Sequence, residues 1–475
     1  MTDIRHRAIL DEILRTSLAA FIERSFYTLN PEQEFLSDRH IDAIAHHLEC
    51  VERGELTRLA IALPPRHLKS LCASVAFPAW VLGRNPTKRI IAASYAADLA
   101  EGFSLQTRKI MAESWYRRIF PKTIFDPKRI SLEEIRTTRH GYRIATSVGG
   151  ALTGKGGNIV IVDDPLKAGE SCSEAVRESA RNWFSTTLMT RLDNPKTDSI
   201  VLVSQRLHVD DLIGLAIEQG GWTILELPAT ATEYQEIPLA KGGLWRRQPG
   251  DILQPNRVGE AELKQLRKDL GSANFAAQYQ QQPASPEGNL IEMKWFEQYE
   301  GQPRLEQFEA IVQSWDPAMV PGESNDYSVC TTWGIVGARF YLLHVFREQL
   351  NYPDLRRAVV KLKEDFQATM VVVEYAGSGI SIYQDLDDTD NPDERWIHNY
   401  TPRGDKVSRL THQLAKIEAG MVYLPTNAPW LAALKSELAV FPHGRHDDQV
   451  DSMSQFLRVL DHEPWPLDSL SYFAR

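Results

Sequence analysis

Hydrophobic and polar positions divide the chain into stretches of different periodicity. Apolar residues recur at helical spacing within residues 8–50, which predicts helices there. From Leu59 onward, short apolar runs alternate with amphipathic, helix-like segments, and the runs include LAIAL, RIIAAS, YRIATS, NIVIVDD and SIVLVS. This alternation of strand and helix predicts a mostly parallel sheet with helices packed on its faces.

The periodicity fades between about Leu227 and Met293, where Pro, Gly and Gln accumulate. A second series then begins with three antiparallel-looking strands, AIVQSWD, YSVCTTWGIV and RFYLLHVFRE, followed by a helix-like run and the strand TMVVVE. We therefore expect an α/β chain in four parts. They are a helical N-terminal region at 1–50, a first α/β domain at 51–230, a connecting region at 231–300 and a second α/β domain at 301–475.

Composition supports this division and limits the function. The 475 residues are 43% hydrophobic and 24% charged, as in an ordinary globular protein with more than one core. The net charge of −10 argues against a uniformly basic coat, but residues 51–150 hold 17 Lys or Arg against 8 Asp or Glu. Four scattered cysteines and the lack of a long apolar run lead us to expect a reducing compartment, with neither secretion nor membrane insertion.

The segment LAIALPPRHLKSLCAS resembles a phosphate-binding loop. A buried-looking strand precedes Lys69 and Ser70, and an apolar helix follows them. In that context, backbone N–H groups and the lysine bind phosphates, while the serine hydroxyl reaches Mg²⁺. Leu63 and Leu68 stand where the GxxxxGK[ST] pattern has glycine, so the match is weak by itself. A second match, GGALTGKG at 149–156, leads into a strand, and we interpret it as a loop at the sheet edge.

The strand NIVIVDD ends in Asp163 and Asp164, the form of a Walker B element. Asp163 would hold Mg²⁺ and Asp164 would orient or deprotonate the attacking water. A further strand ends in Ser204, Gln205 and Arg206, where polar groups sense the γ-phosphate in motor ATPases. An acidic pair at a strand end is also a common turn signal, so the prediction depends on its combination with Lys69 and Ser70.

Acidic residues also follow strands in the second half of the chain. They are Asp316, Glu374, Asp447, Asp448 and Asp451. Carboxylates gathered at such positions suit two-metal phosphodiester hydrolysis, and a charge at the end of an apolar strand needs a partner or a metal. Each acid alone would more often be surface decoration. His443 and His446 flank the last cluster and are candidate imidazole ligands, although solvated histidines are the better account of them.

Together these motifs resemble the large terminase subunit of tailed bacteriophages and prophages. The resemblance runs from about residue 35 to 458 and includes PPRHLKS, TGKGGNIVIVDDP, VSQRLHVDDL, FAAQYQQQP, SWDPA, VVVEYAGSG, GDKVSR and FPHGRHDDQVDSMSQ. It implies an ASCE-type, P-loop ATPase domain with a mostly parallel sheet, followed by an RNase H-like α/β nuclease domain.

The resemblance also implies a role for each matching residue. The nucleotide-binding residues would be Pro65, Arg66, His67, Leu68, Lys69, Ser70, Asp163 and Arg206. Arg66 and Asp164 would act on the γ-phosphate and the attacking water, and Ser70 and Asp163 would contact Mg²⁺. The nuclease metal ligands would be Asp316, Glu374 and Asp448, with Asp447 and Asp451 as competitors. Lys406 and Arg409 would lie near DNA.

The implied function is ATP-driven packaging of double-stranded DNA into a procapsid, with cutting of concatemers. The implied cofactors are ATP with Mg²⁺, and two Mg²⁺ or Mn²⁺ ions for the nuclease. Expected partners are DNA, the small terminase subunit and the portal protein, on which a homo-oligomeric ring would form from a chain that is monomeric in solution. The expected location is the host cytoplasm, with absence from the mature virion. Two alternatives stay open: a free-standing ATP-dependent repair nuclease, and a degenerate prophage DNA-binding or assembly protein.

Overall fold

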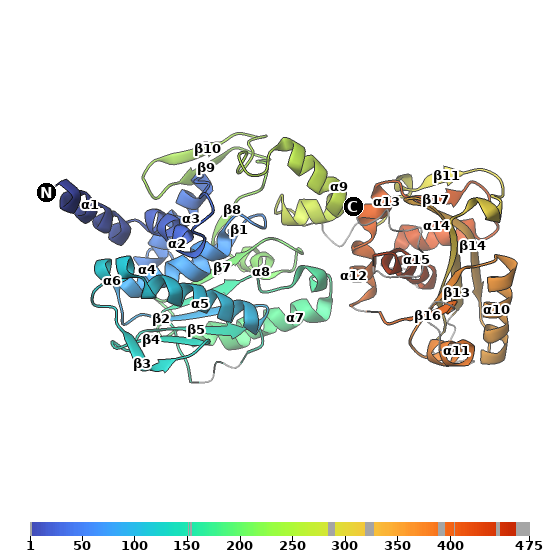
Figure 1. Cartoon of the computed structure of the whole chain (residues 1–475), viewed down its shortest axis with the longest axis horizontal. Helices are drawn as coiled ribbons and strands as arrows, with labels where there is room; N and C mark the ends of the chain where they lie inside the picture. The colour runs from blue at the N-terminus through green and yellow to red at the C-terminus, as the bar shows by residue number, and fades with distance from the viewer. Residues whose placement is uncertain are drawn as a thin grey trace. The chain divides into compact units, whose positions relative to one another are not determined.

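The structure is a computed structural model of the chain and describes residues 2–150, 152, 154–283, 290–318, 327–387, 395–402, 404–442 and 447–461. The chain divides into two compact units, Met1–Ser285 and Pro286–Arg475. Each unit has its own sheet and its own hydrophobic core (Figure 1).

An eight-stranded sheet forms the centre of the first unit, in the order β3-β4-β5-β2-β6-β7-β1-β8. Its strands are β1 (Arg58–Ala62), β2 (Arg89–Ser94), β3 (Phe125–Ile130), β4 (Glu134–Thr137), β5 (Tyr142–Ser147), β6 (Ile159–Asp163), β7 (Ser199–Ser204) and β8 (Thr223–Glu226). The six strands from β5 to β8 in this order are parallel, and β3 and β4 extend the sheet antiparallel. Because β7 lies between β1 and β6, its carboxyl end lies between the two predicted nucleotide motifs, which follow β1 and β6.

Helices cover both faces of this sheet. They are α1 (Thr2–Thr16), α2 (Leu18–Leu29), α3 (Arg39–Glu52), the π-helix η1 (Leu71–Ala76), α4 (Phe77–Arg84), α5 (Ala97–Ala112), α6 (Ser114–Ile119), η2 (Ala168–Glu170), α7 (Glu174–Asn182), the π-helix η3 (Trp183–Leu188), η4 (Met189–Arg191), α8 (Leu212–Gln219) and α9 (Glu260–Gln278). In β6, Ile159 and Ile161 pack toward α2 to α5, while Val160 and Val162 pack toward η3 and α8. Burial on both faces explains why these strands are continuous apolar runs.

Residues 231–283, which the sequence suggested as part of a connection, fold within the first unit. They form the hairpin β9 (Gln235–Pro238) with β10 (Leu244–Arg247), and helix α9, in which Gly271 has a φ of 75° and kinks the axis. Ile237, Trp245 and Leu253 are buried in the core that also contains α2 and α3. These apolar residues are spaced singly among Pro and Gly, so there is little periodic signal in this part of the sequence.

The second unit is built on a seven-stranded sheet in the order β11-β17-β14-β13-β12-β15-β16. Its strands are β11 (Glu297–Tyr299), β12 (Ala310–Asp316), β13 (Ser328–Val336), β14 (Arg339–Glu348), β15 (Met370–Glu374), β16 (Ile397–Tyr400) and β17 (Val422–Pro425). Its helices are η5 (Met293–Trp295), η6 (Leu305–Gln307), α10 (Tyr352–Asp365), α11 (Ser378–Leu386), α12 (Lys406–Thr411), α13 (Leu414–Glu418), α14 (Leu431–Val440) and α15 (Asp448–Val459).

The strand directions in this unit place its acidic residues at one edge. Strands β12, β13 and β14 form an antiparallel meander, and β15 and β16 add to β12 in parallel. Helix α15 packs on the face of the sheet that contains Val312 and Val372, and α10 and α11 pack on the other face with Val371 and Val373. The face that meets α15 is therefore the face on which Asp316 and Glu374 lie.

Candidate functional site

The loop Leu63–Ser70 connects β1 to η1 and adopts a backbone that glycine would ordinarily supply. Arg66 and Leu68 have φ values of 66° and 62°, in the left-handed region. For a residue with a β-carbon this conformation costs about 1–2 kcal/mol. Leu68 packs against the core of the first unit, and Leu63 lies fully inside it. The loop therefore keeps a left-handed residue directly before Lys69, although that residue is not glycine.

Lys69 and the acidic pair come together at the carboxyl ends of the strands. The Lys69 ammonium is buried and lies 2.9 Å from Asp164 Oδ2. Asp164 has a φ of 46°, and its other oxygen accepts a 3.2 Å hydrogen bond from the Ser204 hydroxyl. The backbone N–H of Tyr95 donates to the Asp164 carbonyl. The ends of β1, β2, β6 and β7 thus converge on the two predicted motifs.

Asp163 is the most buried acid of this cluster. Its Oδ2 accepts a 2.6 Å hydrogen bond from the Ser74 hydroxyl, and its Oδ1 has no hydrogen-bond partner among the described residues. Burial, together with the adjacent charge of Asp164, raises the pKa of Asp163 to about 7, against the opposing effects of Lys69, Ser74 and Ser70. A buried carboxylate oxygen without a partner is a suitable ligand for a hard cation such as Mg²⁺.

The other loop residues differ in their environments. Arg66 is exposed, and Pro65 and Ser70 are half-buried. The buried His67 ring bonds the Pro65 carbonyl through Nδ1 at 2.9 Å and meets the ring of His40 edge-on, with centroids 5.7 Å apart. Burial lowers the pKa of His40 to about 3, so this histidine is neutral. No sequence pattern indicated this histidine pair, in which the buried His40 ring packs against the loop residue His67.

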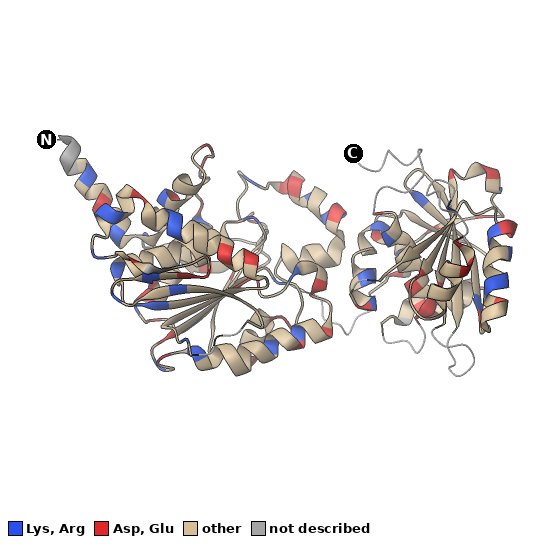
Figure 2. Cartoon of the chain, turned by 60° about the horizontal axis from the view of Figure 1, so that its bottom comes forward, with Lys and Arg blue, Asp and Glu red and all other residues tan. Residues whose placement is uncertain are grey.

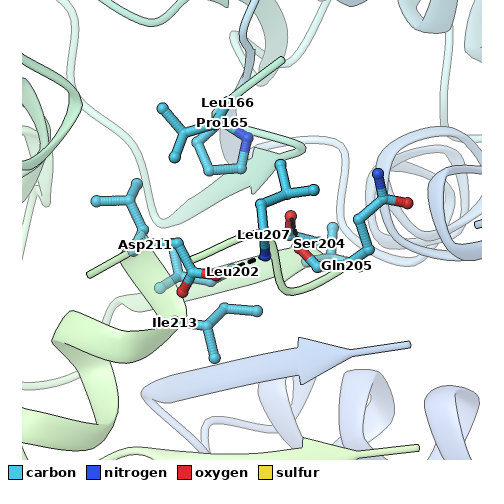
Figure 3. Close-up of a pocket in the computed structure, with 10 residues that line it drawn as sticks. Pro165, Leu166, Leu202, Ser204, Gln205, Leu207, Asp211 and Ile213 are labelled. Carbon is cyan, nitrogen blue, oxygen red and sulfur yellow. Dashed lines mark hydrogen bonds between the residues drawn. The ribbon is translucent and has the colours of Figure 1, made fainter. Parts of the chain in front are cut away.

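Arg206, predicted to contact the nucleotide, is paired within its own loop. Its Nε lies 3.0 Å from both carboxylate oxygens of Asp211, and its Nη2 donates to the carbonyls of His208 and Val209. Arg206 is buried, so this ion pair fixes the loop between β7 and α8. Figure 3 shows Asp211 closing the same loop by accepting from the Leu207 N–H. In this structure the Arg206 guanidinium is thus engaged by Asp211 and by the loop backbone.

Ser204 and Gln205 directly precede Arg206 at the end of β7. Ser204 bonds Asp164, and Gln205 Oε1 is buried and, among the described residues, unpartnered. The cavity beside them in Figure 3 has a volume of about 10 Å³. That volume holds about one water molecule, so it is not itself a nucleotide pocket.

In the second unit, strand register aligns three polar residues in one row. Trp315 pairs with Val373, so Asp316 follows beside Glu374, and Glu374 pairs with Tyr400. Burial and the neighbouring Glu374, Asp451 and Asp448 raise the pKa of Asp316 well above its usual value. Burial also raises the pKa of Glu374. Gly379 permits this arrangement, because a β-carbon there would lie 2.0 Å from the Glu374 carbonyl oxygen.

The third acidic cluster lies at the start of α15. Asp447 is the N-cap residue, Asp448 opens the helix, and Asp451 follows one turn later in a buried position. Asp448 Oδ2 is buried, and no described residue hydrogen-bonds it. Burial, followed by the nearby charges of Glu437 and Asp447, raises the pKa of Asp448. Asp448, whose charge acts on Asp316, therefore has one carboxylate oxygen without a described partner.

Lys406 and Arg409, predicted to lie near DNA, are paired with these acids. The Lys406 ammonium lies 2.6 Å from Asp447 Oδ1 and 2.9 Å from Asp451 Oδ2. Arg409 Nη2 lies 2.7 Å from Asp451 Oδ1. Both of the cations that we expected at a DNA surface thus compensate carboxylates in this structure.

The carboxylates have the chemistry of a divalent metal site but are not drawn together around a common point. Among the described residues, no three His, Cys, Asp or Glu side chains are arranged to hold a metal ion. Two of these acids, Asp447 and Asp451, pair with the Lys406 ammonium instead. The donor set of hard carboxylate oxygens still suits Mg²⁺ or Mn²⁺. His443 and His446 lie outside the described residues.

Two further residues of this site had no sequence signal. Glu437 on α14 accepts from the N–H groups of Gln449 and Val450, so it caps α15 and fixes Asp448. The Tyr400 hydroxyl is buried and, within the described part of the chain, unpartnered. Only their spatial proximity to the acids marks Glu437 and Tyr400, since neither belongs to a local motif.

Comparison with known proteins identifies both the second domain and the overall fold. Residues 313–459 match the family model of the terminase RNaseH-like domain. The large terminase of a thermophilic bacteriophage, solved in complex with ADP, is 10% identical, with a TM-score of 0.54 over 90% of this chain and 100% of that chain. A second crystal form of that phage protein gives a TM-score of 0.56 at 10% identity, with 90% and 100% coverage. No curated protein matches the sequence.

These matches confirm the resemblance to large terminases and the fold class. The chain is an α/β protein in which a domain with a mostly parallel sheet precedes a domain that matches the terminase RNaseH-like model. The complex of the same phage terminase with ATP-γ-S matches with a TM-score of 0.51 at 11% identity, over 89% of this chain and 99% of that chain. In the described part of the chain, no helix has the length and apolar character needed to cross a bilayer.

Replacing Leu68 with glycine tests the conformation of the loop. Glycine removes the cost of the left-handed backbone, about 1–2 kcal/mol, and loses a partly buried side chain of similar value. We expect unfolding free energy to change by less than about 1 kcal/mol, and affinity for a fluorescent ATP analogue to stay equal or increase. Leu63→Ala is the contrast, because Leu63 is core and its truncation should cost about 2–5 kcal/mol. A sharp loss of affinity in Leu68→Gly would contradict this account.

Replacing Lys406 with methionine tests whether this lysine competes with a metal. Removing the ammonium frees Asp447 Oδ1 and Asp451 Oδ2, while Arg409 still holds Asp451 Oδ1. Mn²⁺, measured by titration calorimetry, should then bind roughly fivefold tighter, as a half-exposed ion pair is worth about 1 kcal/mol. Lys361→Met is the matched control, because Lys361 is exposed on α10, against the opposite face of the sheet. Unchanged or weaker Mn²⁺ binding in Lys406→Met would show that the lysine does not compete.

Proposed function

We propose that this protein is a DNA-packaging ATPase that also cuts DNA. The observation that carries the proposal is that each unit has its own cluster of buried or half-buried carboxylates beside a lysine. The first cluster lies at the strand ends of the first sheet, and the second lies where β12 and β15 end beside the start of α15. One cluster follows a phosphate-loop geometry, and the other lies in a domain that matches the terminase RNaseH-like model. The likeness to the large terminase of the thermophilic bacteriophage, solved with ADP, supports pairing both activities in one chain.

In the first unit, ATP would bind with its phosphates at the N-terminus of η1. The backbone of residues 66–69 and Lys69 would hold the phosphates, and Ser70 and Asp163 would hold Mg²⁺, which neutralises phosphate charge.

Lys69 is already paired with Asp164, so a bound γ-phosphate would compete with Asp164 for the Lys69 ammonium. Asp164 would then be free to orient the attacking water, and Ser204 and Gln205 would face the terminal phosphate. Arg66, which is exposed, is available to a phosphate from its own or a neighbouring subunit.

In the second unit, Asp316, Glu374 and Asp448 would hold the divalent ions. The ions would activate water and stabilise the leaving oxygen of a phosphodiester. Asp451 is bound by Lys406 and Arg409, and we assign it to positioning these two cations. Asp447, at the edge of the cluster, would join the metal ligands only after Lys406 has moved. Once released, Lys406 would contact the DNA backbone.

Duplex DNA is the proposed substrate of both units, with the small subunit and the portal protein as assembly partners in the bacterial cytoplasm. In the first unit both basic and acidic residues lie along the elements (Figure 2), and residues 51–150 hold 17 Lys or Arg against 8 Asp or Glu. Several are already paired, including Arg53, Arg84, Arg89, Arg118 and Arg136. DNA contact by this segment would therefore be electrostatic and non-specific, and should weaken steeply with added salt.

Two substitutions separate the two activities. Asp316→Ala should abolish plasmid cleavage with Mg²⁺ or Mn²⁺ and leave ATP turnover intact, because it removes a carboxylate of the second unit only. Lys69→Ala should do the reverse, lowering ATP turnover by a factor of roughly 10² or more, as is typical when one preorganised transition-state contact is removed. ATP hydrolysis and cleavage would be measured in the same samples.

The wild type must show both activities for the proposal to stand. If it shows neither, the protein is a DNA-binding or assembly component without an active ATP site. If ATP hydrolysis separates the strands of a duplex, the protein is a repair helicase-nuclease, because a packaging motor moves along DNA without unwinding it.

A further inference from the structure

The helix that follows the phosphate loop begins as a π-helix, and the sequence explains why. In η1 the N–H of Phe77 donates to the carbonyl of Cys72, five residues earlier. An α-helix would pair the Ser74 carbonyl with the N–H of residue 78, but Pro78 has none. The proline thus prevents a regular helix at this point and frees the Ser74 carbonyl for another donor. Such widened turns occur often at functional sites.

A buried arginine supplies that donor. Arg143 on β5 is fully buried, and its Nη2 donates to the Ser74 carbonyl at 3.1 Å. Its Nε and Nη1 have no hydrogen-bond partner among the described residues. A buried guanidinium is costly unless a charge compensates it. Burial lowers the pKa of Arg143 to about 9, and the nearby charge of Asp163 opposes that decrease.

Whereas the Ser74 carbonyl accepts from Arg143, the Ser74 side chain contacts Asp163. Its hydroxyl donates to Asp163 Oδ2 at 2.6 Å, between residues that are 89 positions apart in the sequence. One residue of the widened turn therefore links two charges, with its carbonyl on Arg143 and its hydroxyl on Asp163. The second oxygen of Asp163 is left without a described partner.

We propose that Ser74 and Arg143 are positioning residues of the ATP site, which hold Asp163 with one oxygen fixed and the other free for Mg²⁺. This inference rests on the proposed ATPase function. The widened turn gives Ser74 the orientation in which both of its groups are used, and Pro78 maintains the turn. Arg143 acts through Ser74 and supplies a positive charge behind the carboxylate.

The test compares Ser74→Ala with the wild type in the full-length protein. Binding of a fluorescent ATP analogue would be measured as Mg²⁺ is increased, and again without Mg²⁺. Loss of the hydroxyl should raise the Mg²⁺ concentration for half-saturation about tenfold, as for other groups that orient metal ligands, and leave Mg²⁺-free binding unchanged. Pro78→Ala should raise it too, by a smaller factor, because an alanine N–H competes with Arg143 for the Ser74 carbonyl.

The matched control is Thr107→Val. The Thr107 hydroxyl lies 3.2 Å from the Val75 carbonyl of the same π-helix and 2.9 Å from the Phe103 carbonyl of its own helix, and it can donate to either. No hydrogen bond between it and Asp163 is seen, and valine keeps its shape. Thr107→Val should leave the Mg²⁺ requirement unchanged. If it raises that requirement as much as Ser74→Ala does, the effect is general loosening and the inference fails.

Two other outcomes separate this inference from the proposed function. An unchanged Mg²⁺ requirement in Ser74→Ala, in a protein that binds the nucleotide, would overturn the positioning role alone. A wild-type protein that binds no nucleotide would overturn the proposed function and this inference with it.

Discussion

Carboxylates buried at strand ends are the constraint on which both units depend. A charge removed from water must be compensated by a cation or by hydrogen bonds, or the carboxylate becomes protonated. The first unit compensates its acids with Lys69 and with the Ser74–Arg143 pair, and the second does so with Lys406 and Arg409. The elements that carry these groups must therefore pack against the strand ends. The strands determine where the acids lie, and the acids in turn require the elements that carry the compensating groups, such as η1 with Ser74 and α12 with Lys406 and Arg409, to pack beside them.

This compensation also explains why the two sites differ in how many carboxylate oxygens are free to bind a metal ion. In the first unit, one oxygen of Asp163 is already free of any described partner, and the lysine lies at the strand ends where phosphates are expected. In the second unit, the lysine lies among the acids themselves, and no three described carboxylates surround a common point. Under the proposed function, the ATP site needs only to share its lysine, whereas the nuclease site gains Asp447 as a ligand only when Lys406 is displaced.

Sequence patterns predicted the strands and the acids at their ends, because a buried strand and its terminal charge are local features. The parallel sheet of the first unit and the meander of the second follow from apolar runs that are buried on both faces. The hairpin at 235–247 was missed, because its few buried residues stand singly. Arg206 was assigned to the ligand because of its position after a strand, and only the structure shows its ion pair with Asp211. Arg143, Glu437 and Tyr400 act through contacts between distant segments, which no local pattern records.

Leu68 in the phosphate loop and Pro78 in the helix that follows it have a common physical account. Leu68 adopts the left-handed backbone in place of glycine, and its side chain recovers part of the cost by packing on the core. Pro78 removes a donor from the following helix, and a side chain from β5 replaces it. In both cases the backbone near the phosphates is determined by the surrounding core, and local propensity is overridden. A departure from a motif therefore argues against the site only if the structure fails to restore the backbone that the motif would have supplied, and here that backbone is retained.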